Sequence, residues 1–263
     1  MDFSRIMAIV NQKGGVGKTT TSINLAAGLS LLGKRVLLID IDPQGNASTG
    51  LGISRRQRDK TIYHILTEGL ALDDAVQSTE TDGLYIIPSH ADLSAAEMEI
   101  GNADGRTIIL RDALKASQLN FDYVLIDCPP ALNLLTINAL AASRSVIVPL
   151  QCEFFALEGL SQLLQTIEMA KANINPDLAI DGVMLTMFDK RNRLSAQVAE
   201  DVRKHLGRAV FDTMIPRNVR IAEAPSFGQP VLIYDPHCSG SRAYMALAKE
   251  LVNKHKNRQN RNK

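Results

Sequence analysis

A glycine-rich segment holds the residues whose types and spacing could do chemistry, and it reads NQKGGVGKTT over residues 11–20. It follows the apolar run Ile6–Val10 and leads directly into a helical pattern over Thr19–Leu32. Glycines let successive backbone N–H groups curl around an anion, and the start of a helix adds its dipole. We therefore predict a nucleotide phosphate site formed by Lys13, Gly14, Gly15, Val16, Gly17, Lys18, Thr19 and Thr20.

Two side chains of this loop have defined roles in that prediction. Lys18 would neutralise the β- and γ-phosphates, and the hydroxyl of Thr19 would ligate Mg²⁺. A standard phosphate loop has glycine where this chain has Gln12, and two adjacent glycines and the extra cation of Lys13 compensate. A glycine turn without a ligand fits less well, because strand, Gly-Lys-Thr-Thr and helix coincide. A dinucleotide-binding fold also fits less well, because no G-x-G-x-x-G occurs.

Carboxylates follow two other apolar runs. One run ends in Asp40, with Asp42 two residues later, and another ends in Asp127. Because the carboxyl ends of parallel strands meet at one edge of a sheet, where ligands bind, these acids should lie near the phosphate loop. Asp40 and Asp127 would then hold Mg²⁺ with Thr19, and Asp42 would orient the attacking water. For a lone aspartate, a helix cap or a solvated strand end is the ordinary alternative.

The elements that must position these residues follow from the pattern of apolar residues. Short β-branched runs predict strands at Ile6–Val10, Val36–Asp40, Leu84–Pro88, Tyr123–Asp127, Ser145–Leu150 and Ile180–Thr186. Helical patterns lie between or after them at Thr19–Leu32, Leu93–Glu99, Ile108–Ser117, Leu134–Ala141, Leu157–Ala172, Leu194–Leu206 and Ser239–Asn253. Because parallel strands need a crossover helix, this alternation predicts an α/β fold: a mostly parallel, twisted sheet with helices on both faces.

No linker-like stretch interrupts this pattern. We expect one domain over residues 1–253 and a basic, disordered tail over residues 254–263. The chain has 263 residues, 45% apolar and 22% charged, which argues against a disordered, collagenous or coiled-coil protein. Its three cysteines, Cys128, Cys152 and Cys238, are far apart, so a disulfide framework or zinc site is not expected. No apolar run approaches the ~18 residues that span a bilayer, and we expect a cytoplasmic protein.

The net charge of +1, from 29 bases and 28 acids, argues against a protein that coats DNA uniformly. The charge is unevenly distributed, however. Residues 189–220 hold eight bases and four acids, and residues 254–263 hold five bases and no acid. Two basic regions therefore stand against an acidic remainder, and either region could contact nucleic acid.

Taken together, the motifs resemble the deviant Walker A ATPases of the ParA/MinD family, and in particular its ParA/Soj branch. The resemblance covers residues 5–252 and rests on five spaced motifs in the family's order. They begin at Lys13 and Asp40, at Asp127 with Cys-Pro-Pro after it, and in the stretches 151–160 and 215–226.

The resemblance implies a slow, Mg²⁺-dependent ATPase that partitions chromosomes or plasmids. ATP would join two subunits into a sandwich homodimer, with Lys13 crossing to the partner's phosphates. Lys13, Lys18 and Asp42 would be its catalytic residues. A ParB-like protein that binds centromere DNA would stimulate hydrolysis and release the dimer from the nucleoid.

The resemblance also implies DNA binding without sequence preference. Candidate contacts are Arg191, Arg193, Arg217 and Arg220, for which solvated helix faces are the alternative. Adenine would lie near Pro216 and Asn218, because an amide can both donate and accept.

The sequence is also compatible with other functions. A phosphate-loop enzyme that phosphorylates a metabolite would need a substrate pocket, which a sequence does not reveal. An ATPase that positions a different cargo is a further alternative. A membrane-binding end is not expected, because residues 254–263 lack an apolar face.

Overall fold

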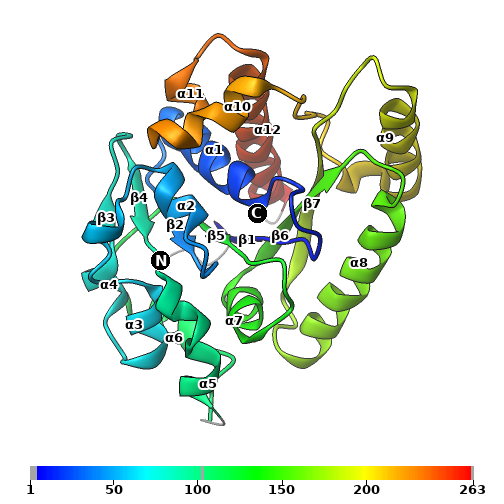
Figure 1. Ribbon diagram of the computed structural model, residues 1–263. Helices are drawn as coiled ribbons and strands as arrows, with labels where there is room; N and C mark the ends of the chain where they lie inside the picture. The colour runs from blue at the N-terminus through cyan, green and yellow to red at the C-terminus, as the bar shows by residue number, and fades with distance from the viewer. Residues whose placement is uncertain (1–4, 102–103, 262–263) are drawn as a thin grey trace.

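The computed structural model describes residues 5–101 and 104–261, and its centre is a twisted sheet (Figure 1). Seven strands occur in these residues, in the spatial order β3-β4-β2-β5-β1-β6-β7. Every neighbouring pair is parallel except β3 and β4, which are antiparallel. The strands are β1 Ile6–Ile9, β2 Val36–Asp40, β3 Gln77–Ser78, β4 Leu84–Ile87, β5 Tyr123–Asp127, β6 Ser145–Gln151 and β7 Ala179–Thr186.

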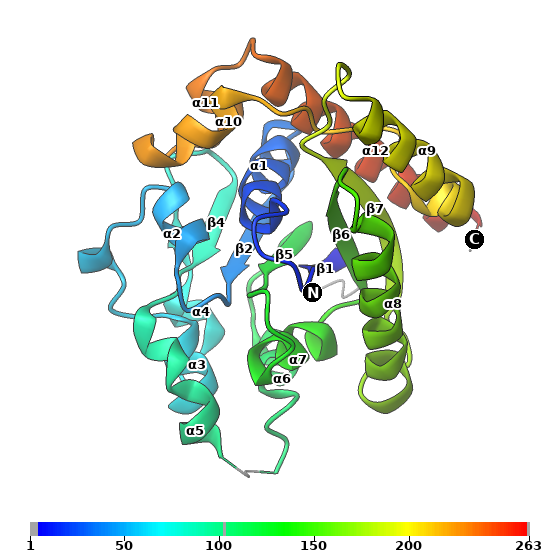
Figure 2. The same ribbon diagram turned by 45° about the vertical axis from the view of Figure 1, so that its right-hand side comes forward.

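Helices cover both faces of this sheet, as the turned view also shows (Figure 2). The longer ones are α1 Lys18–Leu31, α6 Ile109–Ala116, α7 Leu134–Ala142, α8 Ala156–Asn173, α9 Arg193–Leu206 and α12 Ser239–Arg261. The short ones are α2 Asn46–Gly50, α3 Ile62–Thr67, α4 Leu72–Ala75, α5 Ala96–Ile100, α10 Val219–Glu223 and α11 Val231–Tyr234. The predicted fold class is confirmed. None of the described helices is long and apolar enough to span a membrane.

Alternation along the strands explains why two layers of helices form. In β1, Ile6 and Ala8 join the core beneath α3, α6, α7 and α8, while Met7 and Ile9 join the core beneath α1 and α12. All four side chains are fully buried. A strand that is apolar on both faces is stable only when both faces are covered, which places β1 in the middle of the sheet.

The structure corrects the prediction of a disordered tail. Residues 254–261 are helical and complete α12, and the last two residues of the predicted tail, 262–263, lie outside the described residues. Lys254 donates to the backbone carbonyl of Asp181 on β7, and His255 Nε2 lies 2.7 Å from the Asp181 carboxylate. Arg258 contacts the other carboxylate oxygen at 2.5 Å. A buried acid thus provides the partner for bases that looked solvated in the sequence.

Candidate active site

The glycine-rich segment forms the turn between β1 and α1. Gly15 and Gly17 have φ of 76° and 91°, in the left-handed region that favours glycine. The buried amide of Asn11 fixes the start of the turn, because it donates to the carbonyl of Pro149 at 2.7 Å and accepts from the N–H of Lys13 at 2.9 Å. Thr186 on β7 donates to the carbonyl of Val16 at 2.9 Å. Hydrogen bonds to residues of β6 and β7 therefore fix both the start and the middle of the loop.

Lys18 is the first residue of α1, and its side chain lies beneath this loop. Its Nζ donates to the carbonyl of Lys13 at 3.0 Å, and the residue is only 7% exposed. Burial lowers the pKa of Lys18, and the nearby carboxylates of Asp127 and Asp42 oppose that shift. A buried ammonium at the start of a helix is suited to bind a phosphate chain. The negative charge of the phosphates compensates for the hydration that the ammonium loses on burial.

Asp127 ends β5 beside β1, and it is completely buried. One carboxylate oxygen accepts from Ser22 at 2.7 Å, whereas the other, Oδ2, has no partner among the described residues. Burial and the charge of Asp40 raise the pKa of Asp127 to about 7, and the nearby hydroxyls of Ser22 and Thr19 oppose that shift.

The unpartnered oxygen of Asp127 fits a magnesium ion held near Thr19. The described residues contain no group of three or more His, Cys, Asp or Glu side chains placed for a metal. Mg²⁺ does not need one, because it is usually bound by one or two protein oxygens with waters and phosphate oxygens.

Asp40 lies beside Asp127 in the paired strands, but its oxygens are already engaged. Its Oδ2 accepts from the N–H and hydroxyl of Ser48 at 2.8 and 2.6 Å, and its Oδ1 accepts from the N–H of Asp42 at 3.3 Å. Burial raises the pKa of Asp40 to about 6, although the Ser48 hydrogen bonds oppose this. These bonds tie β2 to the start of α2, and a metal role for Asp40 stays a prediction.

Asp42 stands where the chain turns toward α2 and is 8% exposed. Its Oδ1 accepts from the N–H of Gln44 at 3.0 Å, which fixes the carboxylate near the ammonium of Lys18. A carboxylate held in this way can orient a water molecule.

Lys13 differs from the other loop residues because its side chain points away from the loop. Its Nζ forms an ion pair with Glu153, which follows β6, and about half of the side chain is exposed. Its backbone carbonyl remains inside, bound to Lys18.

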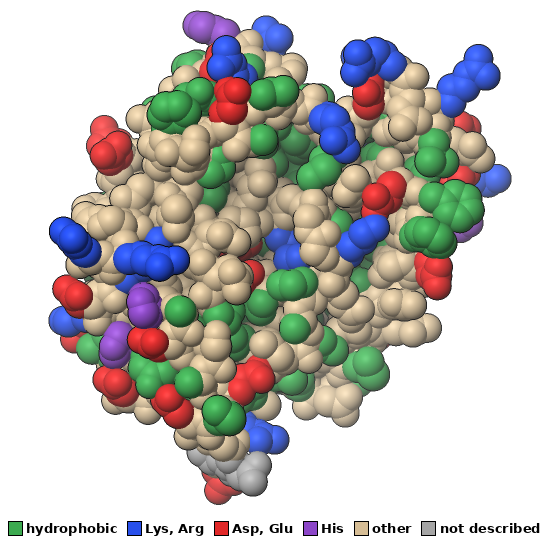
Figure 3. All heavy atoms as spheres, in the orientation of Figure 1, with side chains coloured by type: hydrophobic (Ala, Val, Ile, Leu, Met, Phe, Trp, Pro, Cys, Tyr) green, Lys and Arg blue, Asp and Glu red, His purple; other side chains and the backbone are tan. Residues whose placement is uncertain are grey.

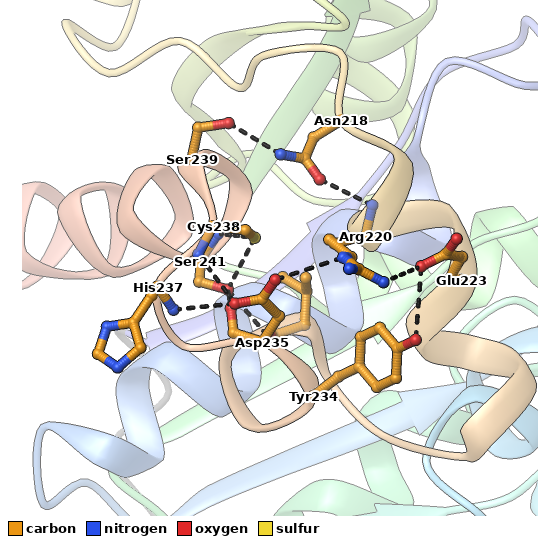
Figure 4. A network of polar contacts seen from close by, with 10 residues as sticks. Asn218, Arg220, Glu223, Tyr234, Asp235, His237, Cys238, Ser239 and Ser241 are labelled. Carbon is orange, nitrogen blue, oxygen red and sulfur yellow. Dashed lines mark hydrogen bonds and ion pairs between the residues drawn. The ribbon is translucent and has the colours of Figure 1, made fainter.

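A cavity of about 190 Å³ continues from the phosphate loop toward α10. The predicted base-binding residues Pro216 and Asn218 both line it, together with Gly17, Thr20, Thr186, Met187, Ile215, Arg217, Ile221, Ala222 and Tyr244. The Asn218 amide is not free, however (Figure 4). Its oxygen accepts from the N–H of Arg220 at 2.8 Å and so caps α10. Its nitrogen donates to the hydroxyl of Ser239 at 2.8 Å. Sequence reasoning missed Met187 and Tyr244, since neither stands in a recognisable motif.

The four arginines proposed for DNA lie on two neighbouring segments. A backbone bridge between Phe188 and Pro216 brings the loop before α9 next to the segment before α10. The space-filling view shows basic side chains standing out over the loop before α9, at the upper right (Figure 3).

The structure divides these arginines into two kinds. Arg191 is paired with Asp189 at 3.0 Å, and Arg220 with Glu223 at 2.9 Å and Asp235 at 3.4 Å. Arg193 and Arg217 are exposed and form no ion pair within the described residues. Arg193 and Arg217 can therefore contact a phosphate without first breaking an ion pair with an acidic side chain.

A phosphate loop after the central strand, a buried lysine and an acid at the end of the neighbouring strand define a P-loop nucleoside triphosphatase. The family model described as "AAA domain" matches residues 4–180. The chromosome partitioning protein ParA of Caulobacter vibrioides (strain NA1000 / CB15N) is 58% identical over 257 residues, 97% of this chain and 96% of that protein. The sporulation initiation inhibitor protein Soj of Bacillus subtilis (strain 168) is 52% identical over 248 residues, 94% of this chain and 98% of that protein.

A solved structure agrees with the nucleotide site. Cobyrinic acid a,c-diamide synthase from Mycobacterium smegmatis, with bound ATP analogue and magnesium, has a TM-score of 0.83 at 36% identity and covers 96% of both chains. The chain belongs to the ParA/Soj family of partitioning ATPases, as its motifs predicted. It is an ATPase, and ATP and Mg²⁺ are its cofactors.

Proposed function

We propose that this ATPase segregates DNA through a cycle of dimerisation. The ATP-bound homodimer binds DNA without sequence preference, and a ParB-like partner stimulates hydrolysis and so releases it. The name of the relative that is 58% identical to this chain, chromosome partitioning protein ParA, supports a role in partition. The structural observation that carries the dimer is the outward side chain of Lys13.

Lys13 is suited to act on a second subunit. Its ammonium is about half exposed and lies with Glu153 instead of over its own loop. In a two-fold dimer the same contact occurs twice, so each Lys13 reaches the phosphates of the other subunit. A second cation there stabilises charge that develops during phosphoryl transfer, which makes hydrolysis depend on assembly.

Within one subunit, the division of work follows from the contacts. Lys18 neutralises the phosphate chain. Thr19 and the unpartnered oxygen of Asp127 would hold Mg²⁺, which would supply charge neutralisation at the phosphate oxygens. Asp42 holds the attacking water, because its carboxylate is fixed by Gln44 close to the loop. Pro216 forms a wall of the base cavity, and Asn218 reads the base only by exchanging its bond to Ser239.

DNA binding is proposed for the paired segments that carry the four arginines. Arg193 and Arg217 contact phosphates directly, while Arg191 and Arg220 exchange their acids for phosphates. One copy of this surface offers few contacts, and a dimer offers twice as many. Since each phosphate contact releases counterions, affinity should rise steeply on dimerisation and fall steeply with salt. In the cell, this predicts a cytoplasmic protein on the nucleoid.

The test is co-sedimentation of the full chain with a long DNA fragment in the presence of ATP, ADP or no nucleotide. Only ATP should bring the protein down with DNA, and a ParB-like partner should reverse this within one round of hydrolysis. Equal binding in all three conditions would contradict the proposal. ATP turnover that depends on a metabolite and ignores DNA and the partner would favour a phosphotransferase instead.

A further inference from the structure

A second hollow lies at the amino ends of β1, β6 and β7, the edge of the sheet opposite the phosphate loop. Its volume is about 340 Å³. Its lining comes from the residue before β1, the turn into β6, the turn into β7 and the last turns of α12: Arg5, Arg144, Ser145, Asp177, Ala179, His255, Arg258 and Gln259. The ATPase cycle described above uses none of them.

Three arginines from three separate elements meet at this hollow. Arg5 donates to Gln259 at 3.3 Å, Arg144 pairs with Asp177 at 2.9 Å, and Arg258 pairs with Asp181 at 2.5 Å. Each guanidinium carries five N–H donors, so most of these donors have no acceptor within the described residues.

Two buried nitrogen atoms in the wall lack a hydrogen-bond partner within residues 5–101 and 104–261. They are Nε of Arg5 and Nδ1 of His255, whose side chain is only 8% exposed. The other ring nitrogen of His255 is used, 2.7 Å from Asp181. Buried polar atoms are almost always paired, so an unpaired one marks a place where water or a ligand completes the structure.

Each of the three arginines has an acid nearby, but none of these acids occupies all of its donors. Asp181 is buried behind the hollow and accepts from Ser145 and Arg258, and His255 lies 2.7 Å from it. The side chain of Asp177 is 77% exposed, where water screens it. Asp122 is shared, at 3.8 Å from Arg5 and 3.7 Å from Lys34.

We propose that this hollow is a second anion site, which takes the phosphate group of a phosphate ester. A guanidinium group can donate two parallel hydrogen bonds to a pair of phosphate oxygens. Three guanidinium groups around one hollow carry more N–H donors than the nearby carboxylates accept. The volume is in the range of small-ligand pockets and accommodates a phosphate with its sugar. The ligand is therefore a free sugar phosphate or a phosphodiester of DNA, and both present the same group to Arg5 and Arg144.

The test is calorimetric titration of the full chain, saturated with ADP and Mg²⁺ so that the phosphate loop is filled. One arm uses ribose 5-phosphate and the other a short DNA duplex, at fixed ionic strength. Arg5→Gln and Arg144→Gln should each weaken binding about tenfold or more. Asp177→Asn should tighten it several-fold, because it frees Arg144, and a purely structural role for these residues would not produce this gain.

Arg111→Gln is the matched control, because Arg111 is a partly exposed, ion-paired arginine on α6. It should leave the affinity unchanged. The arm whose affinity responds identifies the source of the phosphate group. Binding of neither probe, or an equal loss in the Arg111→Gln control, would overturn the proposal. Because ADP fills the phosphate loop throughout, the result is independent of ATP-dependent dimerisation and DNA release.

Discussion

Replacing Asp181 with asparagine should destabilise the fold by removing the charge that holds the end of α12. The side chain is fully buried and accepts from Ser145 at 3.1 Å, His255 at 2.7 Å and Arg258 at 2.5 Å. Hydrogen bonds to a charged acceptor contribute about 1.5–3 kcal/mol each. Asparagine keeps part of them, and water replaces part of the Arg258 contact because that side chain is 49% exposed.

We therefore expect a loss of about 2–3 kcal/mol in the free energy of unfolding, measured by urea denaturation at pH 7. At this chain length, the melting temperature should fall by roughly 5–10 °C. Asp177→Asn is the control. It removes a carboxylate four residues away that is mostly exposed, and it should cost less than about 0.5 kcal/mol.

The pH dependence separates the charge of Asp181 from its packing. Burial alone would raise the pKa of Asp181, but the hydrogen bond and charge of His255 with the charges of Arg258 and Lys254 outweigh it and lower the pKa. A lowered pKa stabilises the fold above the unfolded-state value, about 3.9, and this stabilisation disappears as pH falls through the folded-state value. The difference between wild type and Asp181→Asn should be full at pH 7 and pH 5 and shrink below about pH 4. A difference absent at pH 7, or already lost at pH 5, would refute the reasoning.

Three variants test the proposed cycle. Asp42→Ala should bind ATP but release phosphate at least about 100-fold more slowly, and an unchanged rate would exclude water positioning. Lys13→Ala should bind ADP normally and stay monomeric with ATP in light scattering; an ATP-dependent dimer would argue against a lysine that crosses between subunits. Arg193→Glu should dimerise yet lose DNA affinity, with a salt slope reduced by about 1 per lost phosphate contact. The Arg111→Glu control should bind DNA as wild type does.

Much of the fold could be predicted because its strands are continuous apolar runs. Val36–Asp40 and Tyr123–Asp127 begin and end at the predicted residues, since burial on both faces leaves no room for polar interruptions. The short elements escaped prediction. The strand Gln77–Ser78 has only two residues, and α10 and α11 have five and four, so their stability comes from packing and not from their own sequence.

Some features of the candidate site could likewise be predicted from the sequence, and others could not. The positions of Lys18 and Asp127 beside the phosphate loop could be predicted because strand, loop and helix fix their places along the chain, while their roles stay predictions. The hydrogen bonds of Asp40 to Ser48 and of Asn218 to Ser239 depend on segments distant in sequence or on local caps, which spacing does not encode. The ordered end of α12 was missed for a related reason: its partner, Asp181, lies 74 residues before His255.

The central position of β1 has a consequence for how the protein folds. Among the described strands, β1 pairs with β5 and β6, so these partners become available only after Tyr123 and the residues that follow it have been synthesised. Contacts of such long sequence separation form slowly, and an unpaired apolar strand is prone to aggregate while it waits. Because Pro149 on β6 and Thr186 on β7 hold the phosphate loop, we expect the loop to take shape, and ATP to bind, only after these strands have joined the sheet.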